Sequence, residues 1–350
     1  MIYDPNLENC RDIRCEDIKS ITCSTYRDKT EIILKPVESC NFRCPYCIVS
    51  QKNDARRRKI DFEKVDLMFK NIPEFIEKHQ KITGEKNYTV KFIGGEPTLI
   101  DLNKYIKQMN LHDVQQYTIS TNLYRSKEYF KEINDTVKNM GAKLFISAGF
   151  HAVEYTNRIG DIESYVQKIK DILEFCEVKI VAVISDETIN IVSEMCENVE
   201  KETKSSKHKL KIQIRINKTL KSEDRSKKLE DAFDNLREKY SSGKITKNME
   251  VEFLDGKKAK GTTFDLIRAM HNMPNVCFNG WSCEMINNFT KLSFRGYDGA
   301  IQSCPFCEPD GNLYTKDFEF LNSYNKTGNK ICTAKHCNLS INNNIIKRIN

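Results

Sequence analysis

The sequence predicts an α/β protein built as a partial (β/α)6, TIM-like barrel, followed by a small cysteine-rich C-terminal domain. Short apolar segments with strand character alternate six times with segments of helical periodicity between residues 30 and 265. Such alternation indicates parallel strands with helices packed outside them. Six units are fewer than the eight of a closed barrel. After about residue 265 the helical periodicity fades, and Cys, Asn and Gly accumulate.

Six segments are expected to be strands because each is short, apolar and bounded by polar or glycine-containing turns. They are residues 31–35, 88–93, 117–121, 143–150, 178–185 and 210–216. A helix is expected after each strand, over 62–79, 102–109, 127–141, 162–176, 188–201 and about 223–240, the last of them polar. We expect Pro73 to kink or break the first helix and Gly141 to end the third.

Length and composition set the class of protein. The 350 residues are 39% hydrophobic and 30% charged, which is typical of a globular enzyme or binding protein. The predicted division is an N-terminal segment over 1–29, a barrel over 30–265 and a cysteine-rich domain over 266–350. No apolar run approaches the roughly 20 residues that span a bilayer, and the polar N-terminus lacks the apolar centre of a signal peptide. We therefore expect a cytoplasmic protein without a membrane partner. A net charge of +7 does not by itself indicate a nucleic-acid partner.

Three cysteines lie in the loop directly after the first predicted strand: Cys40, Cys44 and Cys47. Thiolates bind soft or borderline metals, and cysteine thiolates hold iron–sulfur clusters. Because a cubane cluster contains four irons, three cysteines leave one iron open to a non-protein ligand. The alternative is a structural zinc site that a distant fourth ligand completes.

Further unusual residues follow the ends of later predicted strands. The segment GGEPT begins at Gly94, STN ends at Asn122, and SAGFHAVEY covers 147–155. Parallel α/β folds carry their chemistry at the carboxyl ends of the strands. These segments are therefore expected to gather beside the cysteine loop.

The spacing Cys-x3-Cys-x2-Cys with Tyr46 before the last cysteine, together with GGEPT and STN, resembles the radical S-adenosylmethionine (SAM) superfamily over roughly residues 30–220. The resemblance implies that the three cysteines hold a [4Fe–4S] cluster whose open iron binds SAM. Reductive cleavage of SAM would give a 5′-deoxyadenosyl radical that abstracts hydrogen from a substrate. A reductant such as flavodoxin or ferredoxin would supply the electron.

The resemblance also implies a SAM site at the strand ends. Gly94 and Gly95 would let the backbone approach the methionine end of SAM closely. Glu96 would accept a hydrogen bond from the SAM ammonium. Thr121 and Asn122, from the STN motif, would complete this side of the site.

Three more residues are expected at SAM, each with an alternative role. Tyr46 would lie near the adenine, or have only a packing role. Ser147 matches the position on the fourth strand that contacts the ribose. Arg215, at the end of the sixth strand, would pair with the SAM carboxylate or form a surface salt bridge.

The segment after the fourth strand supplies the predicted substrate-facing residues. His151, Glu154 and Tyr155 lie beyond the strand end, where the substrate is expected. His151 would transfer a proton or bind an anionic or hydroxylated substrate. Its alternative role is a hydrogen bond that stabilises the loop.

The C-terminal cysteines predict an auxiliary cluster. Cys283, fifteen residues, Gly299, four residues and Cys304 resemble the start of the SPASM and Twitch domains, which add auxiliary iron–sulfur clusters to radical SAM enzymes. The segment SFRGYDGAIQSC resembles their β-hairpin, with Asp298 and Gly299 in the turn.

One auxiliary [4Fe–4S] cluster is the expected content, with two clusters as the alternative. Its expected ligands are Cys283, Cys304, Cys332 and Cys337. Cys277 and Cys307 would replace one of these, hold a second cluster with an open iron, or bind no metal. A zinc ribbon is the alternative to any auxiliary cluster.

Three functions are compatible with these features. The first is a radical SAM oxidase or dehydrogenase acting on a small polar substrate, such as a sugar, nucleotide or amino-acid derivative. An auxiliary cluster that accepts an electron from the substrate favours net oxidation. The second is a peptide-modifying (RiPP-type) maturase, less favoured because fewer than thirty residues precede the first strand, where many maturases carry a leader-binding domain. The third is a non-catalytic iron–sulfur or zinc scaffold.

The cysteine distribution predicts two separate metal sites. A variant with Cys40, Cys44 and Cys47 all changed to Ala should lose SAM cleavage yet keep about four irons after anaerobic reconstitution, because its C-terminal cysteines are intact. Iron and sulfide analysis measures this. A colourless protein that contains zinc would contradict the auxiliary cluster, and about eight irons would indicate two auxiliary clusters.

Overall fold

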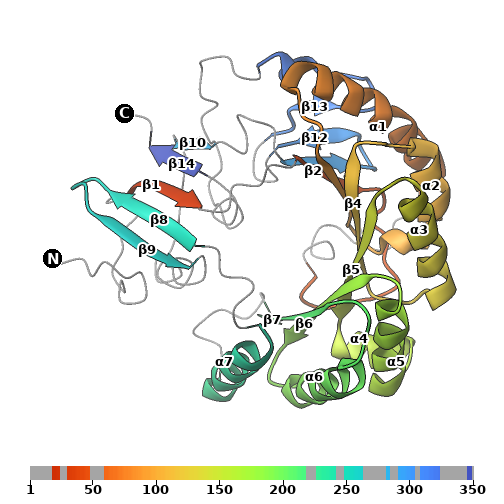
Figure 1. Cartoon of the computed structure of the whole chain (residues 1–350), viewed down its shortest axis with the longest axis vertical. Coiled ribbons are helices and arrows are strands. Elements are labelled where there is room, and N and C mark those ends of the chain that lie inside the picture. Colours follow the sequence, from red (N-terminus) through yellow and green to blue (C-terminus); the bar gives the residue numbers. More distant parts are fainter. Residues whose placement is uncertain are drawn as a thin grey trace.

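The computed structural model describes residues 18–23, 30–47, 59–217, 226–241, 248–262, 281–283, 291–303, 308–323 and 345–348. Six parallel strands in chain order form the centre of its larger sheet. They are β2 (Thr30–Lys35), β3 (Tyr88–Phe92), β4 (Val114–Thr121), β5 (Lys143–Phe150), β6 (Glu177–Ile184) and β7 (Leu210–Ile216). The described sheet curves but does not close, because β7 and β13 are its two edges (Figure 1). The predicted partial barrel is confirmed.

Helices cover the convex face of this sheet, as Figure 1 shows. They are α1 (Phe62–Thr83), α2 (Leu102–Met109), α3 (Lys127–Asn139), α4 (Ala152–Arg158), α5 (Ile162–Leu173), α6 (Ile189–Thr203) and α7 (Lys227–Ser241). Short 3-10 turns form η3 (Pro97–Leu99) and η5 (Glu319–Ser323). Along the strands, alternate apolar side chains such as Val90, Ile146 and Ile180 are fully buried, which is typical of the face that meets the helices.

Helix α1 continues through Pro73, so the expected break is wrong. Asp61 caps its start by accepting from the Lys64 N–H, and Gly84 ends it with a φ of 72°. An interior proline costs about 3 kcal/mol, whereas each large apolar side chain that becomes buried contributes roughly 1.5–3 kcal/mol. The buried face of α1 carries Val65, Met68, Phe69, Ile72, Phe75 and Ile76. This packing outweighs the lost hydrogen bond. Gly141, as predicted, follows the end of α3 with a φ of 78°.

The predicted C-terminal hairpin is present and extends the barrel sheet. Strand β11 (Lys291–Arg295) pairs antiparallel with β12 (Ala300–Gln302), and the turn between them contains Gly299 with a φ of 73°. Strand β11 also pairs parallel with β2, and β13 (Gly311–Asn312) continues the sheet beyond β12. By its pairing the hairpin therefore belongs to the same sheet as the barrel strands.

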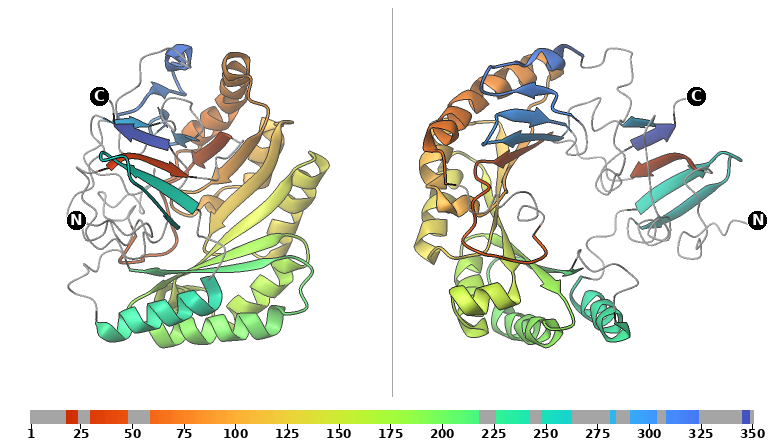
Figure 2. Two further views of the ribbon diagram at one scale, coloured as in Figure 1. Left: turned by 60° about the vertical axis from the view of Figure 1, so that its left-hand side comes forward. Right: turned by 180° about the vertical axis from the view of Figure 1, so that it is seen from behind.

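A second sheet combines segments from distant parts of the sequence. Its order is β10 (Trp281–Cys283), β14 (Ile345–Arg348), β1 (Ile18–Cys23), β8 (Asn248–Phe253) and β9 (Lys258–Thr262), all antiparallel. Strands β8 and β9 lie within the range predicted for the barrel, yet β8 pairs here with β1 of the N-terminal segment, and β9 pairs with β8. Figures 1 and 2 show this sheet beside the larger one, on its open, concave side.

The C-terminal segment packs on α1. Phe75, fully buried, meets the rings of Phe294 and Phe318 edge-on, with centroids 4.9 Å and 5.2 Å away. Asn71, also buried, donates from Nδ2 to the carbonyl oxygen of Leu313 at 2.9 Å. These contacts hold β11 and the segment between β13 and η5 against the helix that follows the cysteine loop. None of the described helices is long and apolar enough to cross a membrane.

Phe75 should be essential to this packing. The Phe75→Ala variant is expected to lower the free energy of unfolding by about 3–5 kcal/mol, because it removes a large side chain from a closed core. Urea denaturation followed by circular dichroism measures the change. Phe62→Ala on the same helix is the control: Phe62 is 55% exposed, so its loss should cost less than about 0.5 kcal/mol. Similar losses in both variants would contradict the packing argument.

Candidate active site

The three cysteines of the first motif share one loop beyond the carboxyl end of β2. Cys44 is buried, and Cys40 and Cys47 are half-buried. The Phe42 N–H donates to Cys40 Sγ at 3.4 Å, and the Cys47 N–H donates to the Cys44 carbonyl at 3.1 Å. Phe42 is only 1% exposed, so the middle of the loop is fixed in the core.

Gly95 brings the end of β3 against the start of this loop. Its N–H donates to the Val37 carbonyl at 3.0 Å, and the Glu96 N–H donates to the Ser39 carbonyl at 2.8 Å. A Cβ on Gly95 would lie 2.0 Å from the Ser39 oxygen and 2.4 Å from the Glu38 oxygen. Both are backbone atoms that cannot rotate away. Only glycine therefore allows the two segments to pack this closely.

Glu96 ties the ends of β3 and β4 together. Its side chain is 2% exposed. Oε1 accepts from the Thr98 N–H at 3.0 Å and from the Thr98 hydroxyl, and Oε2 accepts from the Asn122 N–H at 2.7 Å. Burial raises the pKa of Glu96, and the hydrogen bonds from these donors act in the opposite direction.

Asn122 connects the end of β4 to the cysteine loop. Its Nδ2 donates to Asn41 Oδ1 at 2.7 Å, and its own Oδ1 accepts from the Tyr124 N–H at 3.2 Å. Thr121, 4% exposed, accepts from the Leu123 N–H at 3.0 Å. Both motif residues thus hold the turn after β4 in place, next to the residue that follows Cys40.

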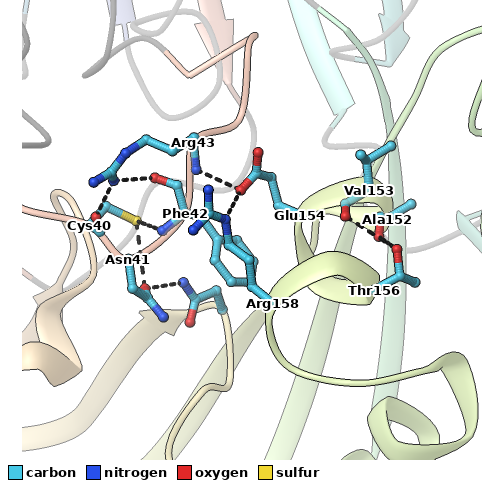
Figure 3. A network of polar contacts seen from close by, with 10 residues as sticks. Cys40, Asn41, Phe42, Arg43, Ala152, Val153, Glu154, Thr156 and Arg158 are labelled. Carbon is cyan, nitrogen blue, oxygen red and sulfur yellow. Dashed lines mark hydrogen bonds and ion pairs between the residues drawn. The ribbon is translucent and has the colours of Figure 1, made fainter.

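Helix α4 contacts the cysteine loop from the end of β5. Glu154 Oε2 accepts from the Arg43 backbone N–H at 2.8 Å and from Arg158 Nε at 2.7 Å (Figure 3). His151 Nδ1 lies 2.8 Å from the hydroxyl oxygen of Tyr46. Burial lowers the pKa of His151 to about 4, so the imidazole is neutral near pH 7. The sequence motifs at the ends of β2, β3, β4 and β5 therefore form one connected network.

Comparison with known proteins identifies this network. Residues 34–197, which include the cysteine loop and the ends of β3, β4 and β5, match the family model of the Radical SAM superfamily. The chain is a radical SAM enzyme. It uses the [4Fe–4S] cluster and SAM that this superfamily employs.

The chain is also similar to individual proteins, one by sequence and two by structure. It is 25% identical to a cysteine-type anaerobic sulfatase-maturating enzyme of Clostridium novyi (strain NT), an alignment that covers 88% of this chain and 84% of the relative. Native anSMEcpe with bound AdoMet is 18% identical, with a TM-score of 0.49, over 84% of this chain and 81% of that one. Streptococcus suis SuiB is 13% identical, with a TM-score of 0.49, and the 86% of this chain that aligns spans 66% of SuiB.

The donor atoms of the loop fit the cluster of a radical SAM enzyme. Within the described ranges, no three His, Cys, Asp or Glu side chains converge on one metal ion. The thiolates of a [4Fe–4S] cluster each bind a different iron, so they need not converge on one point. Whether the loop fits a cluster is therefore judged by the chemistry of its three thiols. Burial raises the pKa of Cys40 to about 11 and that of Cys44 to about 12. Both are therefore protonated near pH 7, and binding of the cluster has to displace these protons.

Other residues predicted for the radical SAM site are less closely connected. Ser147, 8% exposed, lies on β5 between Ser120 of β4 and Lys179 of β6. Arg215 is exposed on β7, where Nη2 donates to Gln213 Oε1 at 3.2 Å. Among the described residues Arg215 forms no ion pair.

Tyr155 does not lie where the sequence places it. It is fully buried, with its ring 5.0 Å from that of Tyr165 and 6.2 Å from that of Phe150. The helical turn that follows His151 directs this side chain into the core, so its predicted contact with substrate is wrong.

Five of the predicted auxiliary ligands lie outside the described residues: Cys277, Cys304, Cys307, Cys332 and Cys337. Cys283 is the last residue of β10, where its backbone pairs with Ile346. The auxiliary cluster stays a prediction.

Sequence reasoning missed three residues of the network: Asn41, Arg43 and Arg158. Arg43 Nη1 donates to the carbonyls of Cys40 and Phe42, at 2.6 Å and 2.9 Å, so the side chain closes the loop on itself. Asn41 and Arg43 lie between the motif cysteines, but the cysteine spacing alone gives them no role. Arg158 has a signal in the sequence, since it follows Glu154 by four residues and such pairs meet on a helix.

The close approach at Gly95 gives a sharp prediction. Gly95→Ala should displace the cysteine loop, because its Cβ would overlap the Ser39 carbonyl. We expect the reconstituted variant to lose about half or more of the iron that Cys40, Cys44 and Cys47 would bind. Gly84→Ala is the control, since a Cβ there meets no atom within 4 Å although the φ of 72° costs some stability. Iron content equal to wild type in Gly95→Ala would contradict the role of this contact.

Proposed function

We propose that this radical SAM enzyme modifies a residue within a polypeptide and oxidises it. The sequence analysis favours a small polar substrate and places a peptide-modifying maturase second. The observation that reverses this order is the similarity to a sulfatase-maturating enzyme, which covers most of both chains.

The extent of that alignment supports the proposal. The family match ends at residue 197, whereas 88% of this chain aligns with the sulfatase-maturating relative. The similarity must therefore continue past the barrel core into regions outside the superfamily match. A sulfatase is a protein, so the natural substrate class for such a relative is a polypeptide.

Each part of the network has a role in the proposed reaction. When bound, the cluster and SAM supply a 5′-deoxyadenosyl radical that removes a hydrogen atom from the substrate. Cys40, Cys44 and Cys47 hold the cluster, and Gly95 keeps their loop against the end of β3. Glu96 holds the neighbouring turns in register.

The concave face of the sheet offers polar contacts for SAM and substrate. Ser120, Ser147 and Lys179 are neighbours in the parallel register, so their side chains point to the same face. Phe145, two residues before Ser147, lies on this face too, and Lys211 Nζ is 5.8 Å from its ring centroid. Ser147 is our candidate for contact with the SAM ribose.

Net oxidation requires a second step. After a hydrogen atom leaves to the SAM-derived radical, the substrate must lose one proton and one electron. The electron acceptor belongs to the class of iron–sulfur clusters or external one-electron acceptors. One SAM is consumed for each product, and the product is two hydrogens lighter than the substrate.

The test uses synthetic peptides that contain one cysteine deuterated at its β-carbon. Anaerobically reconstituted, reduced enzyme should transfer deuterium to 5′-deoxyadenosine and give a peptide about 3 Da lighter than the labelled substrate, because one deuterium and one hydrogen leave, as read by mass spectrometry. The same peptides with Ala in place of cysteine are the control. The Cys40→Ala/Cys44→Ala/Cys47→Ala variant should give neither product.

Two outcomes would contradict parts of this proposal. Turnover of sugars, nucleotides or free amino acids, with no reaction of any peptide, would return the substrate to the small polar class. Peptide product of unchanged mass that carries solvent hydrogen would indicate epimerisation and exclude net oxidation.

A further inference from the structure

Two side chains from one short stretch of the chain contact the cysteine loop on both sides of Cys44. Glu154 accepts from the backbone N–H of Arg43, one residue before Cys44. His151 is hydrogen-bonded to the hydroxyl of Tyr46, two residues after it. Both come from α4 and its N-cap residue, directly after β5. We propose that this stretch braces the cluster loop, and that His151 and Glu154 are positioning residues that do not contact the substrate.

The geometry at Glu154 supports a role in positioning. A single oxygen, Oε2, accepts from both the Arg43 N–H and Arg158 Nε (Figure 3). The Glu154 side chain is 16% exposed and Arg158 is 46% exposed, so the arginine holds the carboxylate from the solvent side. Bonds to an ionised acceptor are stronger than those between neutral groups. The carboxylate therefore faces the loop backbone.

The geometry at His151 also supports a role in positioning the loop. Its ring lies 5.7 Å from the Tyr46 ring and 6.0 Å, edge-on, from the ring of Phe42. A Cβ on Gly149 would be 2.7 Å from His151 Nε2, so glycine at that position makes room for the imidazole against β5. The ring is thus enclosed by the loop and by β5, with its Nδ1 engaged by Tyr46.

The consequence is a loop that is set in place before the cluster binds. The backbone N–H of Arg43 has a fixed acceptor, and the Tyr46 side chain has a fixed partner. Cys44, which is buried between these two points, is thereby held in position. This inference depends on Cys44 binding the cluster and is independent of the substrate. It is tested without substrate, so its failure would leave the proposed reaction on a polypeptide untouched.

Two conservative variants separate a brace from a catalytic carboxylate. Glu154→Gln keeps the reach of the side chain and an oxygen that accepts from the Arg43 N–H. Glu154→Asp keeps the charge but shortens the side chain by one methylene, so the carboxylate no longer reaches the Arg43 N–H. A brace must reach the Arg43 N–H. Iron release from Glu154→Asp should therefore resemble that from Glu154→Ala, whereas iron release from Glu154→Gln should stay close to wild type. A catalytic base acts only on the substrate, so that role would leave iron release unchanged in all three variants.

The readout is the rate at which the full-length, reconstituted and reduced protein loses iron to bathophenanthroline disulfonate. Iron release from the same substitutions in the Cys40→Ala/Cys44→Ala/Cys47→Ala background is subtracted. We expect release about tenfold faster for Glu154→Ala and Glu154→Asp, and within about twofold of wild type for Glu154→Gln. Glu77→Ala is the matched control, because Glu77 pairs with Lys81 at 2.7 Å on the exposed side of α1.

The bond between His151 and Tyr46 has its own test. His151→Phe and Tyr46→Phe each remove the same hydrogen bond while keeping a ring. Both should speed iron release and alter the electron paramagnetic resonance spectrum of the reduced cluster. The double variant should be little worse than either single one, because the shared interaction is already lost.

These measurements can overturn the proposal. Wild-type rates of iron release in Glu154→Ala and Glu154→Asp, or a faster release from Gln than from Asp, would reject Glu154 as a positioning residue. Additive effects, or unchanged release and spectra in both phenylalanine variants, would reject the role of His151. If Glu154→Ala fails to fold, as checked by circular dichroism of the metal-free protein, the Asp and Gln pair decides the question.

Discussion

The pairing of two backbone segments past the ends of β2 and β3 is the constraint on which this site depends. The hydrogen bonds from Gly95 to Val37 and from Glu96 to Ser39 continue the parallel ladder beyond the regular strands. They bring the start of the loop, at Cys40, beside the turn of Gly94, Gly95 and Glu96. Glu96 then joins that turn to β4 through Asn122, and Asn122 returns to the loop through Asn41. The ring of contacts closes only because residue 95 lacks a side chain.

Most of the barrel, and the position of the site at the carboxyl ends of its strands, could be predicted from local sequence patterns. Apolar alternation found β2 to β7 because their buried faces meet helices, and strand direction placed Cys40, Gly95 and Asn122 at one edge. Patterns of this kind describe one segment at a time. They cannot say which atom of Glu154 meets the backbone of Arg43, 111 positions away. They also misplaced Tyr155, because the turn of α4 that decides its direction depends on packing against Phe150 and Tyr165.

The second sheet was beyond prediction for a related reason. Strands β1, β8 and β14 come from opposite ends and the middle of the chain, and each is short. A short strand alone has little pattern, and its identity depends on the partners it finds. The hairpin of β11 and β12 was predictable because its turn is local. Its parallel pairing with β2 was not, because no residue of β11 signals a partner so far away.

That parallel pairing has a consequence for the order of assembly. During synthesis the N-terminal part of the chain leaves the ribosome first. Strand β2 leads directly into the cysteine loop, yet one of its two edges waits for β11, about 260 residues later in the sequence. Until β11 has been made, the backbone groups on one edge of β2 lack their final partners. The cysteine loop then follows a strand that is not yet paired on both edges. Contacts of such long range form slowly. Maturation of the metal site is thereby linked to synthesis of the chain as far as β11.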